Sequence, residues 1–457
     1  MSTEGIKEHA ELHRGLKNRH IQMIALGGAI GTGLFYGSAT TIQTAGPAIT
    51  LGYLVGGFVI FLIMRALGEM SVEEPVSGAF SHFAYKYWGD FPGFFSGWNY
   101  WFNYIVVSMA ELAVVGTYIN YWLPGIPTWV SALVFLATIT AINLINVEAF
   151  GEFEFWFALV KVVAIIAMIL LGLAIILFGF GRGGEAVGFT NLTAHGGFFP
   201  KGITGLLLSL VMVMFSFGGV ELIGITAGEA DNPKKSIPQA INQVVWRILI
   251  FYVGALLVLV SLYPWNKVGT TGSPFVEIFS QIGIPAAAGI LNVVVLTAAL
   301  STYNSGLYSN GRMLHSLALQ GNAPRMFTKV NKRGVPVTGV LFSSAITLLA
   351  VLLNFLVPGK VFLYLVSVAL IAGIFNWTMI LITQLKFRAS KTPEEVSKLE
   401  FKLPWFPIAN YIVLAFLAMI VVLMAYIPDY RFSLYVGPVW ILILYIGHKL
   451  RGNPATK

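Results

Sequence analysis

Five charged residues interrupt long apolar runs of this sequence: Arg65, Glu69, Glu111, Lys161 and Glu221. A charge inside such a run is costly and usually marks a transport pathway or a proton relay. Lys161 is the most informative, because a lysine removed from water can release and regain a proton. Glu111 and Glu221 are candidate proton carriers or ammonium partners. For Arg65, Glu69 and Glu229 we prefer a structural network near helix ends.

A glycine-rich run, GGAIGTG at 27–33, lies inside an apolar stretch from 21 to about 41. Each glycine within a helix costs roughly 0.5–1 kcal/mol relative to alanine, so the run predicts a broken helix. In a bilayer, unwound backbone is tolerated only where it is buried in protein or lines a polar cavity. Free N–H groups at a half-helix N-terminus suit an anion. The alternative is a tight helix crossing that uses glycine as a small contact residue.

A second break, FSFGG at 215–219, favours a binding site over packing glycines alone. The carboxylate of a ligand could take the N–H groups of 29–33 and the Thr32 hydroxyl, and a ligand ammonium could take carbonyls near 26–27 and 215–217. The candidate substrate-binding residues at the breaks are Gly28, Ala29, Ile30, Gly31, Thr32, Gly33, Phe215, Ser216, Phe217 and Gly218.

A third group of candidates recurs at helical spacing. Tyr104, Val107, Ser108 and Glu111 share one face of a helix, from which they can line a common cavity. Aromatic residues there would favour an aromatic ligand by roughly 0.5–1.5 kcal/mol per good ring pair. Aromatic residues make up 14% of the chain, however, so lipid contact or core packing is the better explanation for any single phenylalanine.

The elements that position these residues follow from composition. The chain has 457 residues, of which 57% are hydrophobic and 11% charged, which is typical of an all-α polytopic membrane protein. Twelve apolar windows predict transmembrane helices near 20–42, 47–70, 92–121, 127–147, 153–180, 202–230, 243–264, 284–310, 336–357, 361–385, 406–427 and 431–450. Tryptophans near the predicted helix ends, Trp377 among them, fit interface anchors.

The loops between these windows predict the orientation. With both termini in the cytoplasm, the outer loops receive only Arg182, Lys201, Lys267, Lys360 and Arg431, and the other segments hold most Lys and Arg. The net charge of +8 is thereby explained by cytoplasmic loops and not by nucleic acid. The long stretch 310–336 is interpreted as a solvated loop. His82, His195 and His315 lie in predicted loops or at predicted helix ends, where we expect them to be exposed to solvent.

The two breaks lie in predicted helices one and six, each the first of five. We therefore expect a 5+5 inverted repeat with two extra helices. The expected segments are a cytoplasmic tail 1–19, a first repeat 20–180, a second repeat 202–385, a cytoplasmic linker 386–405, helices eleven and twelve at 406–450, and a cytoplasmic tail 451–457. Helix pairs nine–ten and eleven–twelve could each support a dimer, and the sequence does not decide the oligomeric state.

Three motifs carry a family resemblance: GAIGTG at 28–33, FSFGGVE at 215–221 and GEADNP at 228–233. With them the chain resembles bacterial amino acid permeases of the amino acid–polyamine–organocation superfamily, in the amino acid transporter branch. It is most similar to the aromatic amino acid and phenylalanine permeases, through SHFAYKYWG at 81–89 and LSTYNSG at 300–306. Proline, threonine/serine and 4-aminobutyrate permeases share much of the same scaffold and stay open as alternatives.

The resemblance implies roles for particular residues. Phe217 would be an aromatic gate or wall over the substrate, and Tyr303 and Asn304 would lie at the depth of the pocket. The Lys161 ammonium would stand beside the first broken helix, where sodium-coupled relatives bind their cation, so the driving ion would be H⁺. The expected function is proton-coupled import of neutral L-amino acids, with aromatic ones as the expected substrates, across the bacterial inner membrane by alternating access.

Other classes are less well supported. The sequence shows no nucleotide-binding loop, no metal-ligand spacing and no cysteine, and we therefore expect no enzyme, cofactor, metal or nucleic-acid function. The expected partners are the amino acid, H⁺ and the lipid bilayer. An uncoupled exchanger on the same fold stays open. A membrane amino-acid sensor fits less well, because such sensors usually carry long soluble tails.

Overall fold

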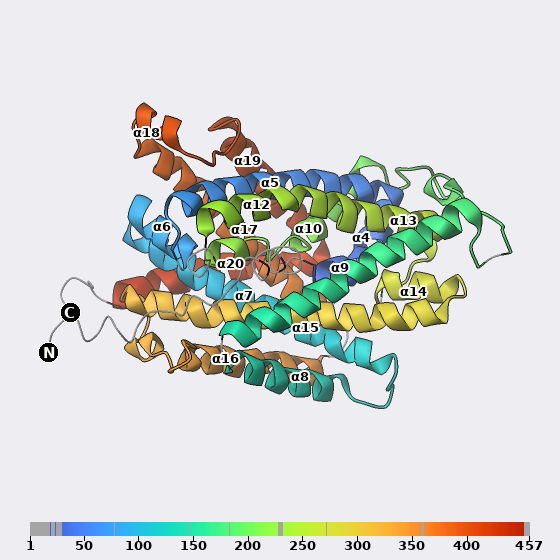
Figure 1. The fold of residues 1–457 in the computed structure, drawn as a ribbon, viewed down its shortest axis with the longest axis horizontal. Coiled ribbons are helices and arrows are strands. Elements are labelled where there is room, and N and C mark those ends of the chain that lie inside the picture. The colour runs from blue at the N-terminus through green and yellow to red at the C-terminus, as the bar shows by residue number, and fades with distance from the viewer. Residues whose placement is uncertain are drawn as a thin grey trace.

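The structure, a computed structural model, describes residues 19, 23, 30–76, 78–145, 147–181, 183–226, 232–270, 272–357 and 361–451. Within these ranges the chain is helical and contains no strand. Long helices lie side by side in an elongated bundle (Figure 1). One end of the bundle carries α6 and α18 and is called the α18 end. The opposite end carries α14 and is called the α14 end.

The helix bounds are as follows. The helices are α3 (Thr32–Phe35), α4 (Gly37–Ala45), α5 (Ile49–Glu73), α6 (Ala79–Tyr87), α7 (Asp90–Asn120), α8 (Thr128–Asn143), α9 (Val147–Phe178), α10 (Gly202–Phe215), α11 (Leu222–Thr226), α12 (Pro233–Arg247), α13 (Ala255–Leu262), α14 (Pro274–Gln281), α15 (Pro285–Leu319), α16 (Val337–Leu356), α17 (Val361–Ala389), α18 (Pro393–Lys398), α19 (Ile408–Tyr426) and α20 (Pro428–Leu450). The shorter turns are η1 (Gly46–Ala48), η2 (Thr190–Leu192), η5 (Trp265–Lys267), η6 (Arg325–Thr328) and the π-helical η4 (Ile248–Gly254). Prolines in the first turn begin α12, α14, α15 and α20, where the missing N–H costs nothing.

The described residues contain nine helical stretches long and apolar enough to cross a membrane. One of them, Gly37–Glu73, counts α4, η1 and α5 together. Its 37 residues would span about 55 Å, far more than the roughly 30 Å of a bilayer core. Gly46, with φ of +63°, separates α4 from α5 at this point. Two further apolar helices, Thr128–Asn143 and Gly202–Phe215, are shorter. The protein is therefore a multi-pass membrane protein, and every predicted window contains a helix.

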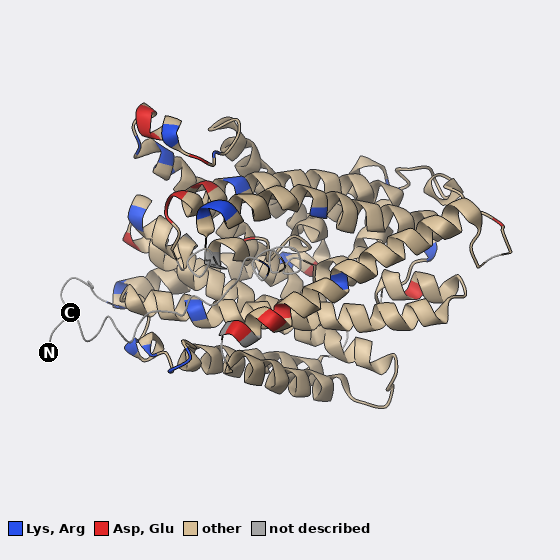
Figure 2. Ribbon diagram, in the orientation of Figure 1, with Lys and Arg blue, Asp and Glu red and all other residues tan. Residues whose placement is uncertain are grey.

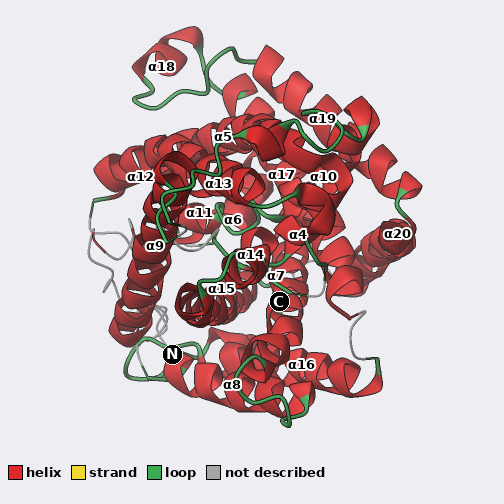
Figure 3. Cartoon of the chain, turned by 90° about the vertical axis from the view of Figure 1, so that its right-hand side faces the viewer, coloured by secondary structure: helices red, strands yellow, loops and turns green. Residues whose placement is uncertain are grey.

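Helices at matching positions of the two predicted halves pack against each other. The pairs are α4 with α10, α5 with α12, α7 with α15, and α8 with α16. Seen along the bundle, α8 and α16 lie at one edge, while α19 and α20 lie along the opposite part of the rim (Figure 3). The broken-helix elements α4 and α10 lie nearer the middle, where neighbouring helices can surround a site (Figure 3).

Two predicted loops are wrong in part. α15 continues to Leu319, so the first ten residues of the stretch 310–336 are helical, and His315 is buried at 2% exposure. The predicted linker 386–405 contains the end of α17 and all of α18. Thr392 and Glu395 begin α18 with a reciprocal capping box, a local signal that hydropathy windows do not detect. The helices α6 and α14 were also not predicted.

Candidate functional site

The second predicted break is confirmed. α10 ends at Phe215, residues 216–221 form turns, and α11 begins at Leu222. Gly219 adopts a φ of +99°, a conformation that glycine reaches without a steric penalty. Two tyrosines hold the turn: the Tyr53 hydroxyl lies 3.1 Å from Ser216 Oγ, and the Tyr252 hydroxyl donates to the Ser216 carbonyl at 3.2 Å. The break is thus a fixed feature of the fold.

These bonds also test the predicted ammonium site at 215–217. The Phe215 carbonyl accepts a hydrogen bond from Gly218 N at 2.9 Å, and the Ser216 carbonyl accepts from Tyr252. A carbonyl oxygen has two lone pairs, so each can still accept one more bond. Both carbonyls are therefore engaged within the protein, although neither is saturated.

The first predicted break is described only from Ile30 onward. Gly28 and Ala29, and the carbonyls at 26–27, lie outside the described residues. After it, α3 covers four residues, Tyr36 interrupts the helix, and α4 continues from Gly37. Ile30 and Thr32 are both fully buried.

The two broken helices touch each other. A Cβ added at Gly33 would lie 2.6 Å from Ser216 Cα, so only glycine allows this approach. A Cβ added at Gly31 would lie 2.6 Å from Thr302 Oγ1 and 3.0 Å from Glu111 Oε1. These glycines therefore do act as small contact residues: Gly33 allows the contact between the two breaks, and Gly31 allows the contact of the first break with α7 and α15. The packing and binding interpretations are compatible here.

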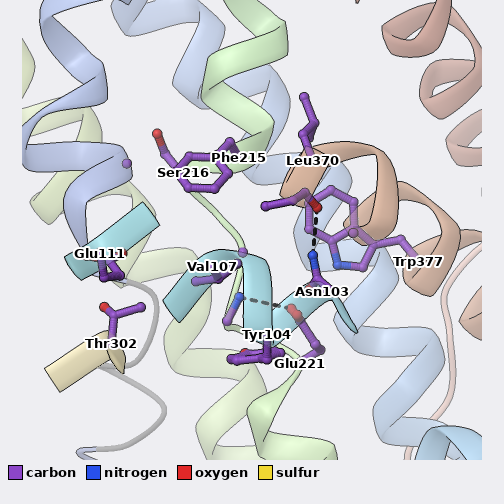
Figure 4. A pocket seen from close by; sticks show the side chains of 16 residues that line it. Asn103, Tyr104, Val107, Glu111, Phe215, Ser216, Glu221, Thr302, Leu370 and Trp377 are labelled. Atoms are coloured by element: carbon purple, nitrogen blue, oxygen red, sulfur yellow. Dashed lines mark hydrogen bonds between the residues drawn. The ribbon is translucent and has the colours of Figure 1, made fainter. Parts of the chain in front are cut away.

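A narrow cavity of about 30 Å³ lies between the breaks and helices α7, α15 and α17. That volume holds about two water molecules. Glu111 and Thr302 lie on one side of it, and Asn103 and Trp377 on the other (Figure 4). The lining residues are Gly31, Gly33, Asn103, Tyr104, Val107, Glu111, Phe215, Ser216, Gly218, Gly219, Glu221, Thr302, Ala369, Leu370, Gly373 and Trp377.

Several predicted residues lie elsewhere. Phe217 is fully buried and packs against the rings of Tyr53 and Tyr252, with centroids 5.8 and 4.8 Å apart. Phe215, not Phe217, is the phenylalanine at the cavity. Ser108 faces α15, where a Cβ at Gly306 would lie 2.8 Å from its Oγ. The predicted face of α7 is thus split between the cavity and the α15 contact.

Tyr303 and Asn304 also do not line the cavity. Tyr303 is fully buried. Asn304 accepts a hydrogen bond from Asn143 of α8 at 2.8 Å and donates to Glu154 of α9 at 3.4 Å. Neighbouring Thr302 is the α15 residue that reaches the cavity. The resemblance therefore identified the right stretch of α15, but the face of α15 that lines the cavity carries Thr302 and not Tyr303 or Asn304.

The two candidate carboxylates lie at the cavity. Glu111, 2% exposed, accepts a hydrogen bond from Thr32 N at 3.4 Å. Glu221, 1% exposed, accepts one from Gly219 N at 3.2 Å, within the second break (Figure 4). Each carboxylate is thus bound to an N–H group of one broken segment. Protonation of either would weaken that bond.

Lys161 lies beside the first broken helix, as predicted. Its Nζ donates to the Ile30 carbonyl at 3.2 Å and to Ser301 Oγ of α15 at 2.9 Å. Lys161 is fully buried and does not line the cavity. Ile30, which makes this contact, directly precedes cavity-lining Gly31. The ammonium is therefore coupled to the cavity through the backbone of the first break.

The sequence analysis missed the contribution of α17. Trp377 is 1% exposed and lines the cavity, so its interpretation as an interface anchor is wrong. Asn103 donates to the Ala369 carbonyl at 2.6 Å and fixes α7 against α17 there. The sequence analysis also did not single out Glu154, a buried carboxylate that is hydrogen-bonded to Ser301 and Asn304 of α15. Its spacing of seven residues from Lys161 on one predicted helix was a usable signal, because such residues share a face.

Arg65 and Glu69 form the structural network that we preferred for them. Glu69 accepts hydrogen bonds from both Arg388 Nε and Nη2, from Gln384, and from Leu403 N. Arg65 stacks on Phe401, 3.8 Å from the ring centroid, and donates to the Lys402 carbonyl. Both residues thus hold the segment after α18 against α5. Glu229 lies outside the described residues.

These features define a helical transporter of the broken-helix type, and sequence comparison agrees. A family model described as amino acid permease matches residues 20–454, and the chain belongs to this family. The chain is 55% identical to the aromatic amino acid transport protein AroP of Escherichia coli K12 over 452 residues, which cover 99% of this chain and 98% of that protein. It is 56% identical to AroP of Salmonella typhimurium LT2 over 450 residues, 98% of each. It is 53% identical over 438 residues to YtnA of Bacillus subtilis strain 168, named an uncharacterized amino acid permease, covering 96% of this chain and 95% of YtnA.

Proposed function

We propose that this permease imports aromatic L-amino acids together with protons, by alternating access around the cavity between the two broken helices. The observation that carries the proposal is the contact of the two breaks at a buried cavity with aromatic and acidic walls. Transporters of this architecture bind substrate where discontinuous helices meet. The membrane is the bacterial cytoplasmic membrane.

The aromatic substrate is supported by the cavity and by the relatives. Tyr104, Phe215 and Trp377 come from three different helices and line the same cavity. An aromatic side chain placed among them would gain roughly 0.5–1.5 kcal/mol per good ring pair beyond the burial of its surface. AroP of two bacteria, named for aromatic amino acids, shares more than half of its residues with this chain.

Proton coupling is supported by Lys161. Its ammonium, held by the Ile30 carbonyl and Ser301, provides a positive charge at the first broken helix. A buried lysine can exist as a neutral amine, which would weaken its hydrogen bond to the carbonyl. Glu111 and Glu221 are the alternative carriers, because each is buried at the cavity and bound to one break.

The inverted repeat is supported by the four pairs of matching helices that pack against each other. The proposed repeats are 20–180 and 202–385, helices eleven and twelve (406–450) lie outside them, and the chain crosses twelve times. Helices one, two, six and seven would rock against the rest. The Tyr53 and Tyr252 contacts with Ser216 join helices two and seven to the break in helix six, as a rocking unit requires.

The orientation is supported by charge. Lys and Arg gather at the α18 end of the bundle, whereas the α14 end has few (Figure 2). Cytoplasmic loops carry the excess of these residues in membrane proteins. The α18 end is therefore proposed to face the cytoplasm, together with the tails 1–19 and 451–457 and the linker region 386–405.

The test is uptake of labelled phenylalanine into proteoliposomes, with and without an inward proton gradient. Unlabelled tyrosine, tryptophan, proline, threonine and 4-aminobutyrate are added as competitors. We expect accumulation only with the gradient, competition by the aromatic amino acids alone, and loss of accumulation in Lys161→Ala.

Two results would contradict the proposal in different ways. If proline or threonine displaced phenylalanine, the aromatic substrate would be wrong and the transport mechanism would stand. Equal uptake with and without the gradient would point to exchange or facilitated diffusion, and would remove Lys161 from the mechanism.

A further inference from the structure

A second buried charge, Glu154, lies beside the proposed coupling lysine. Both residues are on α9 and both are 0% exposed. They are seven residues apart, almost two helical turns, so their side chains leave the same face about 10 Å apart along the axis. An ammonium and a carboxylate buried at this separation need a group between them.

The Ser301 hydroxyl of α15 fills this gap. It accepts a hydrogen bond from Lys161 Nζ at 2.9 Å and donates one to Glu154 Oε1 at 2.5 Å. A hydroxyl has a single proton to donate, so Lys161 must be the donor at its end and Glu154 the acceptor at the other. The three groups form a continuous hydrogen-bonded chain from α9 through α15 and back to α9.

Asn304 holds the other oxygen of Glu154 and is itself oriented by Asn143. Asn304 Nδ2 donates to Glu154 Oε2 at 3.4 Å. Asn143 Nδ2 of α8 donates to Asn304 Oδ1 at 2.8 Å, which fixes the amide so that its NH₂ group faces Glu154. The carboxylate is thereby oriented with Oε1 toward Ser301.

The charges around Lys161 favour transfer of its proton to Glu154 through Ser301 over loss of the proton to water. Among the described residues, the charged side chains that act on Lys161 include Glu154 of α9, Glu111 of α7 and Arg247 of α12, and Arg247 repels it. If the Lys161 proton left for water, Glu154 would lose the cation that is joined to it through Ser301 while still buried, which is costly. Transfer from Lys161 to Glu154 leaves both groups neutral and avoids that cost.

We propose that Glu154 is the internal proton acceptor of the coupling site, and that Ser301 carries the proton to it from Lys161. An N–H bond of the ammonium breaks as its proton joins the Ser301 oxygen, and the original Ser301 proton forms an O–H bond with Glu154 Oε1. A neutral amine, an intact hydroxyl and a carboxylic acid remain. The neutral amine binds the Ile30 carbonyl more weakly, and the first broken helix can then move.

The step has a direction. α9 begins at Val147 toward the α18 end and runs toward the α14 end (Figure 1), so Glu154 lies nearer the α18 end than Lys161. With the α18 end in the cytoplasm, the proton moves inward, as import requires. The inference rests on the proposed coupling through Lys161 and adds the group that stores the proton.

The experiment compares Glu154→Gln and Ser301→Ala with wild type in proteoliposomes. Gradient-driven phenylalanine accumulation is measured together with proton influx, read by a trapped pH-sensitive dye after phenylalanine is added. Phenylalanine counterflow without a gradient is measured in the same preparations. We expect accumulation and proton influx to fall about 100-fold in both variants, since a positioned proton carrier contributes at least that much. Counterflow should stay close to wild type.

Two controls match these variants. Ser301→Thr keeps the hydroxyl and should keep coupling. Glu148→Gln makes the same chemical change at an exposed position of α9 and should behave as wild type. Full proton-driven accumulation in Glu154→Gln would overturn the inference, and so would joint loss of counterflow and accumulation in folded protein, which would indicate a structural role. If wild type itself showed no gradient dependence, the proposed function would fail first.

Discussion

Two buried glutamates, Glu69 and Glu111, lie in long helices and are 1% and 2% exposed, yet their surroundings differ completely. Glu69 accepts four hydrogen bonds, two of them from the Arg388 guanidinium. Glu111 accepts one long bond from Thr32 N, and its Oε2 has no hydrogen-bond partner in the described part of the chain. A carboxylate with every lone pair engaged fixes structure, whereas one with spare capacity can bind a proton or a substrate group.

The largest effect on stability is expected at the saturated carboxylate. Glu69→Ala leaves the Arg388 guanidinium, 9% exposed, without its anion, and removal of one partner from a buried pair costs about 3–5 kcal/mol. Thermal unfolding in detergent measures this loss. The matched control is Glu73→Ala on the same helix, where a 44% exposed side chain pairs with Lys391, and where we expect less than about 1 kcal/mol. If Glu69→Ala and Glu73→Ala lost the same stability, the buried, fully bonded carboxylate would be no more important to the fold than the exposed one.

At the unsaturated carboxylate we expect a functional effect instead. Glu111→Gln can still accept from Thr32 N but cannot ionise, so gradient-driven uptake should fall roughly 100-fold, or about 2.7 kcal/mol, while the melting temperature stays near that of wild type. Glu221→Gln, measured in parallel, decides which carboxylate at the cavity carries the larger share. A melting temperature that falls as far as in Glu69→Ala would place Glu111 with the structural residues.

The contact between the breaks should show an intermediate effect. Gly33→Ala forces a methyl group against the Ser216 backbone and should cost about 1–3 kcal/mol of stability together with most uptake. Gly289→Ala on α15 is the control, because an added Cβ there meets nothing within 4 Å. That substitution should be neutral or stabilising by up to about 1 kcal/mol. Normal uptake by Gly33→Ala would show that the breaks need not touch.

The smallest effect is expected at Glu74, just beyond α5. Burial raises its pKa, but hydrogen bonds from Lys86 and His82 outweigh burial and hold the pKa below its usual value. A lowered folded-state pKa contributes stability that is present above the unfolded pKa and lost as the pH falls through the folded one. Since its side chain is 27% exposed, Glu74→Gln should cost at most about 1 kcal/mol near neutral pH. Unfolding curves of variant and wild type should converge once the pH falls below the lowered folded-state pKa of Glu74.

Much of the fold follows from the sequence because membrane helices are long, apolar and separated by charged loops. The extension of α15 was missed, since polar residues such as Arg312 and His315 lower the hydropathy there. Tertiary contacts compensate: Arg312 stacks over the Tyr308 ring, 3.3 Å from its centroid, and His315 Nδ1 lies 3.1 Å from the Phe327 carbonyl.

The site was predicted less completely. Glycine chemistry located the second break, where Gly219 adopts a φ of +99°. The first break, predicted from four glycines at 27–33, is described only from Ile30 onward. The periodicity of a helix predicts which residues share a face. It does not predict which neighbouring helix or cavity that face contacts. Thr302 therefore replaces Tyr303 and Asn304 at the cavity, and Trp377 was assigned to the membrane interface although it is buried.

The size of the cavity has a kinetic consequence. A space of about 30 Å³ cannot admit phenylalanine without movement of the surrounding helices. Association must then include a conformational step, and its rate should level off as substrate concentration rises instead of increasing without limit. Because packed helices must separate first, the plateau should also depend more steeply on temperature than diffusion does.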